Sequence, residues 1–408
     1  MTCTEPTTTE PTTTEATTTE ATTSEQARVD TGQPPATLTA LVLATGTAVL
    51  VGAEFVPAGV LPLLAHDLHV SEGRAGLAVA ATALAGAITA PTIASVLPRT
   101  DRRRVLLGLL ALAVVSNVLV ALAPTLPLLL AGRVLLGVAI AGYWSFTFGV
   151  GVAITGRPAL VSTAMSLGTS VATIVGVPLA SVLGDSIGWR GVFAILIAAT
   201  AASGLAMARL LPPVPAHPGA GAAMMRQALG NRRLMAGVGL VALAAFGNFA
   251  AYPYIRVALQ AVTPSLVTVL LVAWGIGGLA GNLLGGSLSG RLRLGVALAP
   301  AMLSMGLAVL ALHPSSALVA LAILAWGTGF NMVPVTTQLW VSRIEPKRVE
   351  SAVSLQVTAF QAAITVGAIA GGLVVDHRDV WTAMGVGAIA AALAAVGFAV
   401  LRTVPRTD

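Results

Sequence analysis

The chain has 408 residues, of which 56% are hydrophobic and only 9% are charged, and its mean hydropathy is +0.89. An ordinary soluble domain has about a quarter of its residues charged, so this composition excludes a soluble fold and predicts a surface that faces lipid. In a soluble protein the net charge of +6 would suggest nucleic acid. Here the basic residues lie in short loops between apolar runs, so we expect no nucleic-acid partner.

The first 36 residues form a low-complexity segment in which Thr-Thr-Thr-Glu blocks recur. They hold six acidic residues against Arg28 and contain almost nothing to bury. We therefore expect 1–36 to be a disordered cytoplasmic tail. The only cysteine, Cys3, lies in this tail, which excludes a disulfide framework.

From Leu38 onward, apolar runs long enough to cross a bilayer recur between polar breaks. A Pro- and Gly-rich stretch, 212–233, divides them into two sets of six, so 37–211 and 234–402 are predicted to be two pseudo-symmetric six-helix bundles, followed by a cytoplasmic tail at 403–408. The sequence thus predicts an all-α polytopic membrane protein with about twelve spans: 38–63, 75–97, 104–123, 127–152, 160–184, 190–211, 234–258, 266–288, 295–312, 316–340, 351–374 and 380–402.

The distribution of Arg and Lys predicts the orientation of these spans. With the N-terminus inside, the inner segments hold seventeen basic residues and the outer segments hold four: Arg74, Arg190, Arg256 and Arg378. Cytoplasmic loops carry the excess of positive charge in membrane proteins. We therefore expect both termini and the 212–233 linker to be cytoplasmic.

A weak repeat near 190 residues indicates a duplicated architecture. Gly137 in the fourth span corresponds to Gly327 in the tenth. The basic loop at Asp101 corresponds in the same way to the loop at Arg291.

Glu54 is the only acidic residue deep in a predicted span, where a charge costs roughly 3 kcal/mol or more unless it is used or paired. Burial favours the neutral form of a carboxyl and a nearby cation favours the ionised form, so such a group can carry a proton. Arg133, in the fourth span, is its natural partner. A static buried ion pair between the two is the alternative, as is an Arg133 that reaches toward the lipid phosphates.

Several other polar or aromatic side chains lie within predicted spans and are candidates to line a substrate cavity, although each is also able to form an ordinary interhelical hydrogen bond. They are Tyr143, Trp144, Asn248, Asn282, Asn331, Gln338, Gln356 and Gln361. Span five is distinguished by residues that permit close packing or bending: Gly168, Gly176, Pro178 and Gly184.

The sequence contains no constellation that would support an enzyme. It has no Gly-Lys-Ser/Thr phosphate loop, and its five histidines lack metal-ligand spacing. We therefore expect no catalytic residues, no metal and no cofactor.

These motifs resemble the major facilitator superfamily over roughly residues 38–402, and within it the drug:proton antiporter branch that includes arabinose-efflux-like and chloramphenicol-resistance permeases. The segment from Gly52 to Pro62 resembles the first span of that branch. Arg133 followed by Gly137 resembles its fourth-span motif, whose arginine is implicated in proton coupling. The Gly-Val-Pro sequence ending at Pro178 is similar to its antiporter motif.

The resemblance also assigns an inner-loop gate after span two and its repeat, although the usual motif is shortened here. The residues at the matching positions are Asp101, Arg102, Arg103 and Arg291.

The resemblance implies a monomeric transporter in the cell membrane that alternates between inward- and outward-open states. Proton entry would drive export of a small, largely apolar or amphipathic compound such as a drug or antibiotic, with the lipid bilayer as the other partner. Two alternatives stay open: an exporter of a sugar, nucleoside or amino-acid-like metabolite, and a non-transporting membrane sensor.

Overall fold

The computed structural model describes residues 35–97, 99–215, 229–312, 316–346 and 349–401. Nearly all of the predicted tail 1–36, most of the 212–233 linker and the 403–408 tail lie outside these residues.

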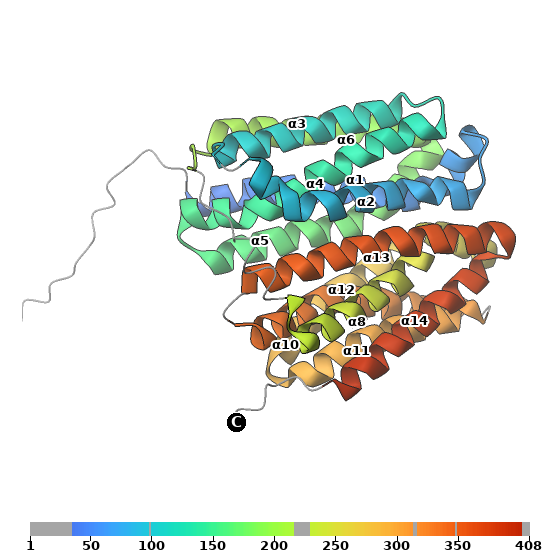
Figure 1. Cartoon of the computed structure of the whole chain (residues 1–408). Coiled ribbons are helices and arrows are strands. Elements are labelled where there is room, and N and C mark those ends of the chain that lie inside the picture. Colours follow the sequence, from blue (N-terminus) through green and yellow to red (C-terminus); the bar gives the residue numbers. More distant parts are fainter. Residues whose placement is uncertain (1–34, 98, 216–228, 313–315, 347–348, 402–408) are drawn as a thin grey trace, which may run out of the picture. The chain divides into compact units, whose positions relative to one another are not determined.

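Helices make up almost all of the described chain, as the composition predicts (Figure 1). The first half contains α1 (Ala36–Asp67), α2 (Glu72–Val96), α3 (Arg102–Ala121), α4 (Leu126–Thr155), α5 (Pro158–Val171), the π-helical turn η1 (Ala172–Gly176) and α6 (Val177–Leu210). The second half contains α8 (Arg232–Ala251), η2 (Tyr252–Tyr254), α9 (Ile255–Val262), η3 (Pro264–Leu266), α10 (Val267–Ser287), η4 (Leu288–Arg291), α11 (Leu292–Ala311), α12 (Ser316–Ile344), α13 (Val349–His377) and α14 (Val380–Val400).

Ten segments of the described chain are long and apolar enough to cross a membrane. Two of them, Leu160–Leu210 with 51 residues and Pro264–Ala311 with 48, are about twice the length that one crossing needs. The first is broken at Gly188, whose φ of 75° is not helical, and the second at the tight turn η4. Counted as two crossings each, they bring the total to the predicted twelve.

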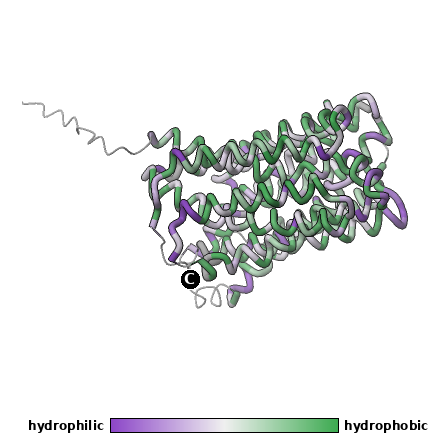
Figure 2. The backbone as a smooth tube through the Cα atoms, turned by 90° about the horizontal axis from the view of Figure 1, so that it is seen from above, coloured by the Kyte–Doolittle hydropathy of each residue, from purple (hydrophilic) through white to green (hydrophobic). Residues whose placement is uncertain are grey.

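Short polar side chains explain where several helices begin. Ser71, Asp101, Asn231 and Asp379 each precede a helix and accept a hydrogen bond from a backbone N–H of its first turn. Such caps satisfy donors that have no partner within the helix. Figure 2 shows that the most hydrophilic parts of the backbone lie mainly at the two ends of the helix bundle.

The two halves repeat the same helix packing, which supports the duplication read from the sequence. A Cβ on Gly137 of α4 would overlap the backbone carbonyl of Thr82 on α2, and a Cβ on Gly327 of α12 would overlap that of Trp274 on α10. The fourth span therefore packs on the second, and the tenth on the eighth, through a glycine at the equivalent position. Figure 1 shows the helices of each half grouped together.

Helices α2 and α13 pack along each other and join the two halves (Figure 1). At their predicted outer ends, the Asp376 carboxylate accepts hydrogen bonds from the Ser71 hydroxyl at 2.6 Å and from the Gly73 N–H at 2.9 Å. Deeper in the protein, Asn282 of α10 reaches Ser170 of α5 at 3.5 Å. The halves are thus held together most strongly at the end that the charge distribution predicts to be outside.

Candidate functional site

The guanidinium of Arg133 holds three helices together. This side chain is fully buried, and it donates from Nε to the Ala78 carbonyl at 3.0 Å, from Nη1 to the Ala53 carbonyl at 2.7 Å and from Nη2 to the Glu54 backbone carbonyl at 2.9 Å. Pro57 explains one of these contacts. Proline lacks an N–H, so the carbonyl of Ala53, four residues earlier, has no helical donor and accepts from Arg133 instead.

The Glu54 carboxylate is left without a hydrogen bond or ion pair in the part of the chain that the structure describes. It is half-buried and interacts electrostatically with Arg133. The structure therefore brings the two predicted coupling residues together, but Arg133 binds the backbone of Glu54 rather than its side chain. The direct ion pair considered from the sequence is not formed, and three donors of the guanidinium bond backbone carbonyls instead.

The predicted antiporter segment follows the seam between the two halves. The π-helical turn η1 ends at Gly176, directly before α6, and it contacts both α1 and α10. Pro178 explains the wider turn, because its ring cannot supply an N–H to the helix and displaces the preceding backbone. Gly168 permits close approach to α1, since a Cβ there would overlap the Ala44 carbonyl, and one on Gly184 would contact Val60. A part of these residues in antiport stays a prediction.

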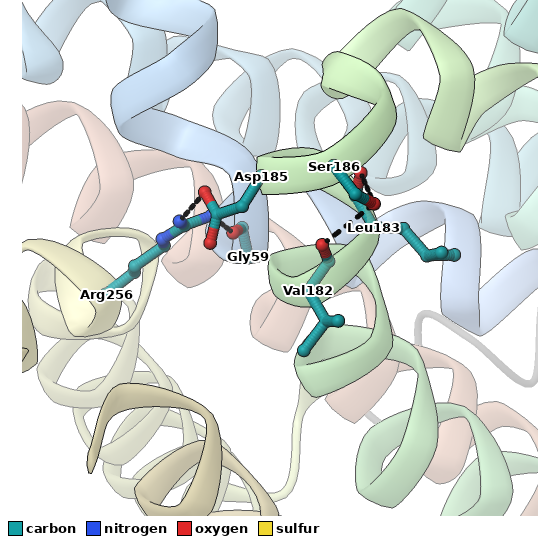
Figure 3. Close-up of polar contacts among 6 residues, drawn as sticks. All are labelled: Gly59, Val182, Leu183, Asp185, Ser186 and Arg256. Carbon is teal, nitrogen blue, oxygen red and sulfur yellow. Dashed lines mark hydrogen bonds and ion pairs between the residues drawn. The ribbon is translucent and has the colours of Figure 1, made fainter. Parts of the chain in front are cut away.

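Arg256, which the sequence assigns to an outer segment, lies in α9 with its side chain buried. It donates to the Gly59 carbonyl of α1 and forms an ion pair with Asp185 of α6 at 2.6 Å (Figure 3). The contact joins the second half of the chain to the first. No sequence pattern paired these residues, which are 71 positions apart.

Tyr143 and Trp144 have different environments although they are adjacent in α4. The Tyr143 ring is buried, and its hydroxyl donates to the Leu43 carbonyl of α1 at 2.9 Å. Gly46 makes room for this ring, since a Cβ there would overlap the phenol oxygen. Trp144 is 41% exposed. The hydroxyl of Tyr143 is thus already used in packing, whereas a substrate role for Trp144 stays a prediction.

Two of the three predicted asparagines form hydrogen bonds within the second half. Asn248 is fully buried, and its Oδ1 accepts from the Trp326 indole N–H at 2.7 Å. Asn331 donates to the Gly327 carbonyl on its own helix at 3.1 Å.

The three predicted glutamines are spread along α12 and α13. Gln356 is buried and donates to the Thr337 hydroxyl at 2.8 Å, Gln338 is exposed, and Gln361 is half-buried against Gly86 of α2. Gln361 alone of the three lies at the seam between the halves.

The predicted inner-loop gate residues hold helix ends in place. Asp101 accepts from the Arg104 N–H at 3.0 Å, which caps α3, and from the Val214 N–H at 2.8 Å, which anchors the start of the linker. Arg102 is buried with its guanidinium 4.5 Å from the centre of the Phe146 ring.

Arg103 donates to the Ala208 carbonyl of α6. Arg291 lines an open surface pocket in the second half, together with Arg293 and Arg343. A gating function for these residues stays a prediction.

The structure reveals an aromatic cluster that was not predicted. It consists of Phe55 from α1 and six rings from the second half: Phe249, Tyr252, Trp274, Trp326, Phe330 and Phe360. The centroids of Tyr252 and Trp274 are 4.9 Å apart, and those of Tyr252 and Phe55 are 5.3 Å apart. Pro253 was the available signal, because proline ends the helical ladder and turns the chain at η2, where Tyr252 lies.

The described residues contain no group of His, Cys, Asp and Glu side chains that could hold a metal ion. Some buried polar side chains, such as Ser170 and Arg256, form hydrogen bonds between the two halves.

A family model described as the Major Facilitator Superfamily matches residues 43–343. The chain belongs to the Major Facilitator Superfamily. It is therefore a multi-pass membrane transporter of small molecules and not an enzyme, as predicted.

The chain is 32% identical over 338 residues to the purine ribonucleoside efflux pump NepI of Escherichia coli O6:K15:H31 (strain 536 / UPEC). The match covers 81% of this chain and 85% of the pump, and the same values hold for NepI of Shigella sonnei (strain Ss046).

Solved structures show the same fold at low sequence identity. The nucleoside transporter NupG matches with a TM-score of 0.73 at 14% identity, covering 89% of this chain and 98% of NupG. A bacterial homologue of the human lysosomal transporter Spinster, inward-facing and occupied, matches with a TM-score of 0.72 at 14% identity, covering 88% and 95% of the two chains. The predicted fold is thus confirmed.

Proposed function

We propose that this transporter exports purine nucleosides or closely related metabolites across the cell membrane in exchange for protons. The similarity to purine ribonucleoside efflux pumps over 81% of the chain supports the substrate class. It favours the metabolite exporter, which the sequence left as the alternative, over the drug exporter.

The observation that carries the coupling part of the proposal is the unpaired Glu54 carboxylate. Arg133 donates three hydrogen bonds to backbone carbonyls. Its positive charge therefore lies near the Glu54 carboxylate without forming a direct ion pair with it. A carboxyl in this setting changes protonation when its distance from the cation or its contact with water changes. Movement of α1 relative to α4 would alter both, and would link proton release to the conformational change.

Purified transporter in proteoliposomes tests the proposal directly. We expect radiolabelled inosine or guanosine to accumulate against its gradient when an opposing proton gradient is imposed, and a protonophore to abolish this accumulation. Glu54→Gln keeps the shape of the side chain but removes its titration. It should abolish uphill transport and leave nucleoside binding and downhill exchange measurable.

Glu72→Gln is the matched control, because Glu72 is the same residue type in the first turn of α2, at the predicted outer end. This variant should transport at the wild-type rate. Uphill transport by Glu54→Gln at the wild-type rate would refute the assigned coupling. A wild-type protein that moves no purine nucleoside would refute the substrate class.

A further inference from the structure

Three hydrogen-bonding groups within the aromatic cluster have no partner among the described residues. They are the Tyr252 hydroxyl, the Trp274 indole N–H and the side-chain NH₂ of Asn248. Asn248 adjoins the cluster because its amide oxygen accepts a hydrogen bond from the Trp326 indole. All three residues are at most 1% exposed. Buried donors are nearly always paired in proteins, because an unpaired donor in an apolar interior is destabilising. Three in one cluster indicate a partner that is not part of the chain.

The unpaired groups lie where the two halves of the transporter meet. The Phe55 ring of α1 packs edge-on against Tyr252, and the Tyr252 hydroxyl is within electrostatic range of the Glu54 carboxylate. Glu54, Phe55 and Phe360 are half-buried, whereas Tyr252 and Trp274 are fully buried. The cluster therefore combines half-buried groups from both halves with buried donors from the second half.

A comparison within the chain shows that one unpaired indole is not enough to define a site. Trp340 is also fully buried with an unpaired N–H. Its ring centroid lies 6.0 Å from that of Phe398, and the ring packs against Gly237. Trp340 thus belongs to a hydrophobic cluster separate from the one that contains Tyr252 and Trp274. The cluster around Tyr252 differs because it combines several unpaired donors with several ring faces and lies where the two halves meet.

We propose that this aromatic cluster is the subsite for the heterocyclic base of the transported nucleoside, with Tyr252 and Trp274 donating hydrogen bonds to the acceptors of its six-membered ring. This assignment rests on the proposed function. A purine is flat and aromatic, so it packs well against ring faces. The six-membered ring of hypoxanthine or guanine carries a nitrogen and an exocyclic oxygen that accept hydrogen bonds, which matches the unpaired donors.

The donors also supply a reason for specificity. A flat compound without acceptors would fill the same space but leave the donors unpaired, and such a site rejects it. In this conformation α1 covers Tyr252 through Phe55. The base gains access when α1 and η2 separate, so the movement between the halves controls the subsite.

Equilibrium binding to the purified full-length protein tests the proposal with two ligands and three variants. Inosine carries the acceptors, whereas benzimidazole ribonucleoside keeps a flat bicyclic base and the ribose but lacks the nitrogens and the oxygen of the six-membered ring. Tyr252→Phe and Trp274→Phe keep an aromatic ring and remove the donor. We expect each to weaken inosine binding by about three- to tenfold, which is the effect of one lost hydrogen bond, and to leave benzimidazole ribonucleoside binding unchanged.

Trp340→Phe is the matched control, since it removes an unpaired indole N–H outside the cluster, and it should bind both ligands as the wild type does. The inference is wrong if both donor variants bind inosine like the wild type, or if they weaken both ligands equally, as a packing defect would. If Trp274→Phe does not fold, Tyr252→Phe, which removes one oxygen atom, decides the test alone. A wild-type protein that binds no purine nucleoside would instead refute the proposed function.

Discussion

The ion pair between Arg256 and Asp185 is expected to hold the predicted outer end of the transporter closed. Arg256 belongs to the second half and Asp185 to the first, so the contact breaks when the halves separate at that end. Asp185→Asn removes the negative charge but keeps the size of the side chain. The buried guanidinium then has only uncharged acceptors within reach in the closed state, among them the Gly59 carbonyl.

The magnitude follows from how unequally the two partners are buried. The Arg256 side chain is 3% exposed and that of Asp185 is 57% exposed. Removing one partner of a fully buried pair costs about 3–5 kcal/mol, whereas a fully exposed pair contributes about 0–1 kcal/mol. An intermediate value of about 2 kcal/mol corresponds to a shift of roughly 30-fold toward the outward-open state, since 1.4 kcal/mol is a factor of ten.

Pulsed electron spin resonance measures this shift directly. Spin labels at His66→Cys and Arg378→Cys, two exposed positions on opposite halves, report the width of the outer end once Cys3 is replaced by Ser. We expect Asp185→Asn to populate a longer distance.

Asp67→Asn is the matched control, because Asp67 pairs with Arg190 within the first half and both side chains are more than 40% exposed. Identical distance distributions for Asp185→Asn and the wild type would refute the reasoning. An equal shift in Asp67→Asn would do the same.

Three further changes test the packing and the topology. Gly137→Ala places a methyl group against the backbone of α2 and should destabilise the protein by about 1–3 kcal/mol in thermal unfolding. Gly149→Ala is the control, because its methyl group meets open space, and equal melting temperatures for the two variants would contradict this packing. Tyr143→Phe removes the bond to α1 and should cost about 0.5–1.5 kcal/mol of stability, and an unchanged melting temperature would show that this bond contributes nothing. Cysteines introduced at Ala220 and His377 test the orientation of the protein in the membrane. An impermeant thiol reagent added to intact cells should label only position 377, and labelling at position 220 would overturn the predicted topology.

The sequence alone determined the features that depend on local properties. Apolar length and basic loops predicted the number of spans, since crossing a bilayer needs about 20 apolar residues wherever they occur. Glycines in register predicted the duplication, which the packing of Gly137 and Gly327 supports. Glu54 was recognisable because an acid within an apolar run is conspicuous without any knowledge of its neighbours.

The tertiary structure decided which side chains meet. A helix that is hydrophobic on all sides carries no pattern that tells which face it turns inward, so neither its rotation nor its neighbours can be read from periodicity. For this reason the sequence did not show that Arg256, which it assigns to an outer segment, is buried against Asp185. The same limit hid the aromatic cluster, whose rings come from helices far apart in the chain. Arg133 was found by its type, but its partners depend on three helices and on a carbonyl freed by Pro57, which only their assembly brings together.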